Sequence, residues 1–231
     1  MTAAAVREWP PVPAPLAWRG RPGARLVRLH LRSRRVPAAV AALAACGGVL
    51  RAALTWHWTF SGGPYAQQIP LIIEAGAAAA VAVTSHSPFG EPERATGRWL
   101  PYLRFGTALA LTGVAIGLLQ LAVTGAGLNE GILVMARNVM GMTGIGLLTS
   151  LVTGGLLAWT LPLGYMAFAQ YALLEAWRSP WMWPVRPPAD RGAWIWASLV
   201  FAAGLLAFGT AHLSRRVPGL RVMLGTSPAP A

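Results

Sequence analysis

The sequence contains no lysine and only one cysteine, and both shortages exclude chemistry. A phosphate-binding P-loop needs the lysine of its G-x-x-x-x-G-K-[ST] motif, so this chain cannot itself be a Walker-type ATPase. Catalysis through a lysine Schiff base is excluded for the same reason. Cys46 cannot form a disulfide within the chain, so it does not indicate a redox compartment, and we interpret it as a small buried apolar residue.

Charge is scarce as well. Charged residues make up 11% of the 231 residues, whereas an average soluble domain has about 25%. Hydrophobic residues make up 55%, and the mean hydropathy is +0.50. These apolar residues form runs of about 20, the length that crosses the hydrocarbon core of a bilayer. The runs cover Val36–Thr55, Ala66–Ser85, Phe105–Thr124 and Ala193–His212, and a longer block, Ile132–Leu174, has room for two crossings.

We therefore predict an all-α integral membrane protein with six transmembrane helices. The net charge of +12 comes from nineteen arginines set against seven acidic residues. The arginines cluster beside the apolar runs, which favours contact with anionic lipid headgroups over binding to nucleic acid. They precede the first run and recur in segment 87–104 and after residue 214, while the connection 56–65 has none. Arg178, Arg186 and Arg191 depart from this pattern, because six helices place their segment outside. The positive-inside rule then places both chain termini and 87–104 in the cytoplasm, at the plasma membrane.

Outside the apolar runs, the chain has two tails and one basic segment. Residues 1–24, rich in proline and arginine, and residues 217–231 are predicted cytoplasmic tails that flank a membrane domain at 25–216. The membrane domain begins with a basic stretch, in which arginines at helical spacing share one face. These are Arg25, Arg28, Arg32 and Arg35. We expect a short amphipathic helix on the inner membrane surface, with a bend at Pro37; the alternative is a simple topological anchor.

Three polar residues within the apolar runs are candidates for a functional site. Glu74 lies well inside the second run, and an ionisable residue there is a functional candidate by default. The alternative is a structural hydrogen bond between helices. Arg137 and Asn138 lie near the start of the long block 132–174, and an ion pair between Glu74 and Arg137 is conceivable.

Glycines in the same runs predict close helix packing. Gly141, Gly144 and Gly146 lack side chains, so a neighbouring helix can approach closely. Gly113 and Gly117 form the small-xxx-small pattern that is common where membrane helices pack.

The segment between the last two runs is rich in proline and tryptophan. Prolines at 180, 184, 187 and 188 exclude a long regular helix. Tryptophans at 177, 181, 183, 194 and 196 are typical of a membrane interface. We expect a short structure that dips into the membrane interface, on the external side in a six-helix topology.

No catalytic constellation is evident. The four histidines are scattered, and none has the spacing of a metal site. Ser85 beside His86 is interpreted as a helix cap, because adjacency in sequence does not make a catalytic dyad. We predict no enzyme activity, no metal and no cofactor.

The order of these features resembles the permease subunits of type-2 ABC transporters, particularly the compact six-helix type of actinobacteria. The resemblance rests on the basic segment "RLVRLHLRSRRVP" and the charged link after the second run. It also rests on the predicted glycine-rich helix pair "ARNVMGMTGIGLLTSLVTGGLLAWTLPLGY" and on the proline- and tryptophan-rich segment "WRSPWMWPVRP". It implies an elbow helix at Arg25–Arg35 and a re-entrant external element at Trp177–Pro188. The external element is short, which argues against handling of large polymers outside the cell.

The resemblance also implies partners. A separate ATP-binding subunit would dock on the cytoplasmic link through Glu93, Arg94, Arg98 and Trp99, and a second permease copy or paralogue would complete a dimer. Transport, most simply export, would use ATP that the partner hydrolyses. Two alternatives remain: a self-contained secondary transporter or channel that uses Glu74 and Arg137, and a membrane scaffold that transports nothing.

Overall fold

A computed structural model of the chain describes residues 31, 32, 35–56, 68–85, 100–124, 131–175, 177 and 179–214. These residues form helices and no strand. The helices are α2 (Val36–Thr55), α3 (Gln68–Ser85), α4 (Leu100–Val123), α5 (Gly131–Thr153), α6 (Thr160–Leu174) and α7 (Arg191–Ser214), with the 3-10 turns η3 (Gly155–Leu157) and η4 (Trp183–Val185). The predicted all-α class is therefore confirmed for the described part.

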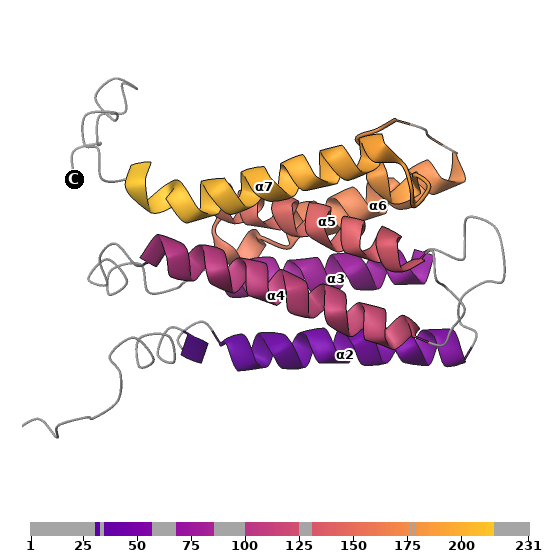
Figure 1. Cartoon of the computed structure of the whole chain (residues 1–231), viewed down its shortest axis with the longest axis horizontal. Coiled ribbons are helices and arrows are strands. Elements are labelled where there is room, and N and C mark those ends of the chain that lie inside the picture. Colours follow the sequence, from indigo (N-terminus) through magenta and orange to yellow (C-terminus); the bar gives the residue numbers. More distant parts are fainter. Residues whose placement is uncertain are drawn as a thin grey trace, which may run out of the picture.

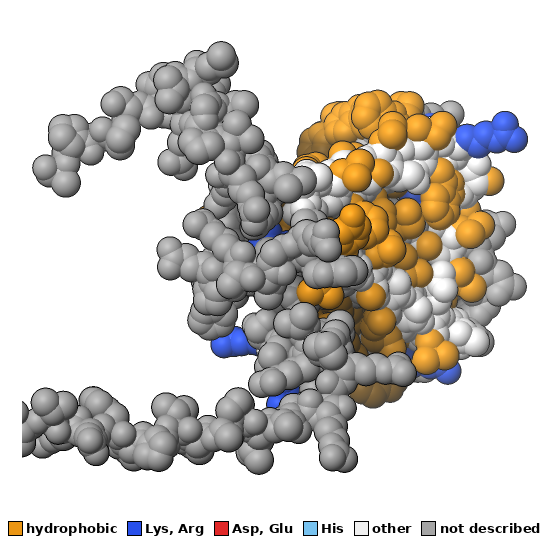
Figure 2. Space-filling view, turned by 60° about the vertical axis from the view of Figure 1, so that its left-hand side comes forward, with side chains coloured by type: hydrophobic (Ala, Val, Ile, Leu, Met, Phe, Trp, Pro, Cys, Tyr) orange, Lys and Arg blue, Asp and Glu red, His pale blue; other side chains and the backbone are white. Residues whose placement is uncertain are grey.

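Five of these helices are long and apolar enough to cross a membrane: α2, α3, α4, α5 and α7. Apolar side chains cover much of the face seen in Figure 2, and few arginines interrupt them. A surface of this kind cannot be left to water over such an area. The chain is thus a multi-pass membrane protein by its architecture.

The predicted sixth crossing is not confirmed, because α6 is too short. Its 15 residues reach about 22 Å at 1.5 Å per residue, whereas the hydrocarbon core is about 30 Å thick. The break occurs at Gly154, whose φ of 82° is a left-handed conformation that ends α5. The chain then makes η3 before α6 begins, so the block 132–174 is one long and one short helix.

The helices run alternately up and down the bundle (Figure 1). The first residues of α2 and the last residues of α7 lie at the same end. The opposite end holds the starts of α3, α5 and α7 and the end of α6. This second end carries Glu74, Arg137 and Asn138, and we call it the strap end after segment 179–190, which is described below.

Helix α5 is the centre of the bundle, in contact with α3, α4, α6 and α7. Its closest neighbour is α7: a Cβ atom added at Gly144 would lie 2.6 Å from Cα of Phe201, and one at Gly204 would lie 2.6 Å from the carbonyl oxygen of Gly144. On another face, a Cβ at Gly146 would lie 2.6 Å from Cβ of Ala82 in α3. The close approach predicted at Gly144 and Gly146 is confirmed.

The small-xxx-small pattern of α4 behaves differently. Gly113 and Gly117 are exposed, and no atom lies within 4 Å of a Cβ added at either position. The packing that this motif predicts is therefore not made within the described part of the chain.

Candidate functional site

The segment between α6 and α7 folds back against the strap end of the bundle. We call residues 179–190 the strap. Its centre, Met182, Trp183 and Pro184, is buried, and η4 contacts α5, α6 and α7. The strap contains a single three-residue 3-10 turn, which confirms that its prolines exclude a long helix.

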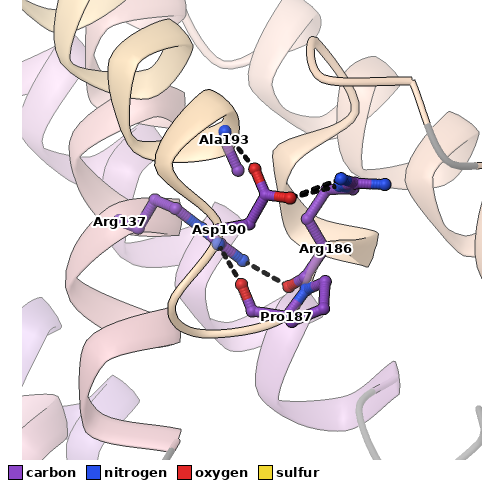
Figure 3. A network of polar contacts seen from close by, with 5 residues as sticks. All are labelled: Arg137, Arg186, Pro187, Asp190 and Ala193. Atoms are coloured by element: carbon purple, nitrogen blue, oxygen red, sulfur yellow. Dashed lines mark hydrogen bonds and ion pairs between the residues drawn. The ribbon is translucent and has the colours of Figure 1, made fainter.

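Arg137 of α5 fastens the strap to the bundle (Figure 3). Its side chain is completely buried. Nη1 donates a hydrogen bond of 2.8 Å to the carbonyl oxygen of Pro187, and Nη2 donates one of 2.8 Å to that of Arg186. A buried cation must have polar partners, because an unpaired charge in an apolar interior is costly. Here the partners are two main-chain carbonyls of the strap, of which that of Pro187 also accepts a hydrogen bond of 3.1 Å from the N–H of Asp190.

The strap is also fixed to the start of α7. The carboxylate of Asp190 accepts a hydrogen bond of 2.8 Å from the backbone N–H of Ala193, so Asp190 caps the helix. It also forms an ion pair with Arg186, whose Nε donates to Oδ2 over 2.9 Å. The Ala193 N–H and the Arg186 guanidinium together hold the pKa of Asp190 below its usual value. The indole N–H of Trp194 donates to the carbonyl oxygen of Pro188 over 2.9 Å.

Glu74 of α3 pairs with Asn138 of α5 inside the bundle. Nδ2 of Asn138 donates a hydrogen bond of 2.8 Å to Oε2 of Glu74, and each residue is only 2% exposed. The direct ion pair with Arg137 that the sequence left open is not formed. Asn138 binds Glu74, while its neighbour Arg137 points to the strap, so one turn of α5 joins two elements.

Aromatic residues of α6 hold the outer side of the strap. Tyr165 donates a hydrogen bond of 2.7 Å through its hydroxyl to the carbonyl oxygen of Trp181, and its ring lies 4.6 Å from that of Trp183. Phe168 stacks on Trp181 with ring centroids 5.9 Å apart. Trp181 is partly exposed beside these rings, as expected for residues at a membrane interface.

The structure thus brings together the three polar candidates predicted within the apolar runs, Glu74, Arg137 and Asn138, near the strap end. Sequence reasoning missed Asp190, although an acidic residue directly before an apolar run is a recognisable helix-capping signal. It also missed the strap carbonyls as partners of Arg137. No sequence signal identifies them, because every residue type carries the same carbonyl group.

The other predicted site residues have different outcomes. Glu93, Arg94, Arg98 and Trp99 of the link predicted to be cytoplasmic lie outside the described residues, as do Arg25 and Arg28. Arg32 and Arg35 are described and exposed. Arg35 has a left-handed backbone (φ 53°) at the N-cap of α2. The chain therefore bends just before α2, close to the bend predicted at Pro37.

Comparisons with protein-family models, with curated proteins and with solved structures gave no match to this chain. The fold and the geometry of the strap end therefore carry the functional argument.

Proposed function

We propose that the chain is the membrane-spanning permease subunit of an ABC transporter, most simply an exporter, and that a separate subunit hydrolyses the ATP. The observation that carries this proposal is the strap. A short proline-rich segment between the last two helices packs into one end of the bundle and is fastened there by Arg137. A structured element at this position is what the resemblance to type-2 permeases implies.

The proposal includes a membrane topology. Residues 155–174 would form a sixth, broken crossing, with η3 extending the short α6. The chain termini would lie in the cytoplasm and the strap outside the plasma membrane. Residues 25–35 would form an elbow helix on anionic lipid. The common end of the start of α2 and the end of α7 supports an even number of crossings.

Cysteine labelling tests this topology in a background with Cys46→Ala. Ala189→Cys, on an exposed part of the strap, should react in intact cells with a membrane-impermeant thiol reagent. Ala95→Cys, in the link 87–104, should react only after the membrane is opened. Labelling of residue 95 from outside would reverse the assignment.

The link 87–104 is the proposed docking segment for the ATPase. Glu93 and Arg94, with Arg98, would fix the orientation and specificity of docking more than its affinity, and Trp99 would pack at the membrane interface. A second copy or paralogue of the permease would complete the transporter. Both partners follow from the resemblance.

The experiment is purification of the tagged chain from native membranes, followed by photolabelling of the sample with an ATP analogue. We expect a co-purifying P-loop subunit and ATP hydrolysis. The triple variant Glu93→Ala/Arg94→Ala/Arg98→Ala should insert normally but lose both the co-purifying subunit and the ATP hydrolysis. The control variant Arg215→Ala/Arg216→Ala removes two arginines from the C-terminal part of the chain. It should keep both the co-purifying subunit and the ATP hydrolysis. Equal hydrolysis by the two variants would refute the coupling role of the link, and a wild-type chain without an ATP-binding partner would refute the permease proposal.

A second candidate, a self-contained secondary transporter, is favoured by one observation: the carboxyl group of Glu74 is buried within a membrane helix beside Asn138. Such carboxyl groups recur in proton relays. This candidate requires transport by the purified chain in liposomes that hold a proton gradient and no ATP. Transport lost in Glu74→Gln under those conditions would favour it over the ABC permease, and absence of all transport would favour a scaffold.

A further inference from the structure

Three buried polar atoms around residues 137–141 of α5 have no hydrogen-bond partner in the part of the chain that the structure describes. They are Nε of Arg137, Oδ1 of Asn138 and Nε1 of Trp183. The three side chains are 0%, 2% and 3% exposed, respectively. Buried polar groups are nearly always hydrogen-bonded, so three together require an explanation.

The three atoms border one short stretch of α5. A Cβ atom added at Gly141 would lie 2.9 Å from Nε1 of Trp183, so the indole lies directly on the helix backbone there. Arg137 and Asn138 are one turn earlier, and residues three or four apart share a helix face. Residues 137–141 span about 6 Å along the helix axis. The absence of a side chain at Gly141 lets the indole approach this polar turn.

The chemistry of the three atoms selects the ligand. The N–H groups of Arg137 and Trp183 are donors, whereas Oδ1 of Asn138 is an acceptor. An anion would be repelled by the acceptor, and a cation would be repelled by the Arg137 guanidinium. Water donates and accepts, and a buried water molecule typically makes about three hydrogen bonds.

We infer that Arg137, Asn138 and Trp183 form a binding site for buried water between α5 and the strap. This water lies beside the amide that binds Glu74, so the Glu74 carboxyl group is one hydrogen-bonded residue away from it. The inference does not depend on the proposed transport function. It assigns Gly141 a role as well: a larger residue there would displace the indole from the site.

Hydroxyl-radical footprinting of the whole chain in lipid nanodiscs tests the site. Radiolysis produces radicals from water, so a buried side chain that touches a bound water molecule is oxidised. We expect Trp183 to be oxidised at a rate near that of Trp181, which is 43% exposed. Met135 and Phe201, buried in apolar clusters that contain none of the three site residues, should remain unmodified. Oxidation of Trp183 no faster than that of these two residues would overturn the inference.

Two controls separate a bound water molecule from opening of the strap. Met182 is fully buried next to Trp183, and oxidation of Met182 in step with Trp183 would indicate opening and overturn the inference. Asn138→Leu removes the acceptor and should abolish oxidation of Trp183 while that of Trp181 is unchanged. Thr143→Val removes another buried atom without a partner in the described chain, from a different face of α5, and should leave Trp183 oxidised as in the wild type. The wild-type comparison stands even if Asn138→Leu fails to fold.

Discussion

Helices α4 and α5 are nearly the same length, 24 and 23 residues, and both are apolar and contain several glycines. The glycines of α4, however, face open space, whereas Gly144 and Gly146 of α5 face neighbouring helices. A Cβ added at Gly106, Gly113 or Gly117 of α4 would meet open space. The corresponding atoms in α5, at Gly144 and Gly146, would overlap a neighbouring helix. A glycine pattern therefore shows that close approach is possible, and burial decides whether it happens.

The contrast extends to polar residues. Helix α5 has Arg137 and Asn138 buried near its start, each bound to a different element. In α4 the buried Thr112 donates only to the carbonyl oxygen of Ala108 in its own helix. The polar groups of α5 thus join α3, α5 and the strap, whereas this group of α4 joins nothing. Variants in the two helices should differ accordingly.

The largest effect is expected for Gly144→Leu. Even its Cβ atom would overlap the backbone of Phe201 and Val200, which a rotamer change cannot relieve, so α5 and α7 must separate. Overpacking costs about 1–3 kcal/mol and occasionally more, and we expect about 3 kcal/mol or more here. The measurement is unfolding by SDS titration in mixed micelles, monitored by circular dichroism.

Gly117→Leu in α4 is the matched control for that variant, with the same change in an equally long helix. It should alter stability by no more than about 0.5 kcal/mol, as surface substitutions usually do. Equal destabilisation by the two variants would remove the contrast between α4 and α5.

The next effect is expected for Arg137→Met, which keeps the length of the side chain and removes its donors. The carbonyl oxygen of Arg186 loses its donor, and a buried unsatisfied group costs about 1–3 kcal/mol. The carbonyl oxygen of Pro187 loses one of two donors, because it also accepts from the N–H of Asp190. We expect a loss of about 2–3 kcal/mol and a strap that opens. Proteolysis within residues 179–190 measures the opening, and Arg104→Met in α4 should leave this segment as resistant as in the wild type.

Asp190→Asn should have a smaller effect, since it keeps a helix-capping oxygen and loses the ion pair with Arg186; Asp190→Ala, which also loses the cap, should cost about 1 kcal/mol. The effect depends on pH. Because the folded-state pKa of Asp190 is lowered, its stabilisation is complete above the ordinary carboxyl pKa of about 3.9. It is lost as the pH falls through the lower folded-state pKa.

Strap proteolysis with an acid-stable protease, compared between pH 6 and pH 3, measures this dependence. The wild type should become more sensitive at the lower pH, whereas Asp190→Ala should be sensitive at both. Equal pH dependence in the wild type and the variant would show that Asp190 does not control the strap.

The smallest effect on stability is expected for Glu74→Gln. The amide keeps an oxygen that accepts the Asn138 hydrogen bond, and hydrogen bonds between membrane helices contribute about 0.6 kcal/mol on average. We expect a change of about 0.5 kcal/mol or less by SDS titration. Glu74→Leu, which cannot accept the hydrogen bond, is the sharper comparison. If Glu74→Leu were as stable as Glu74→Gln, the hydrogen bond to Asn138 would make no measurable contribution to stability.

Much of the architecture follows from the sequence. Runs of about 20 apolar residues specify membrane helices, since a backbone in lipid must satisfy its own hydrogen bonds. Four single runs predicted α2, α3, α4 and α7 with ends a few residues from those observed. The exact division of 132–174 was not predictable, because only the backbone conformation of Gly154 shows where α5 ends.

The sequence by itself also identified Glu74, Arg137 and Asn138 as candidates, since a polar residue in an apolar run is conspicuous whatever its partners. Only the tertiary structure decided what they bind. Whether Glu74 meets Arg137 or Asn138 depends on the rotation of α3 and α5 about their axes, and a difference of one residue turns a helix side chain by about 100°. The same rotation buries the glycines of α5 and exposes those of α4. Composition and spacing fix which residues can pack closely or pair, and helix rotation, set by the packing of the whole bundle, selects the ones that do.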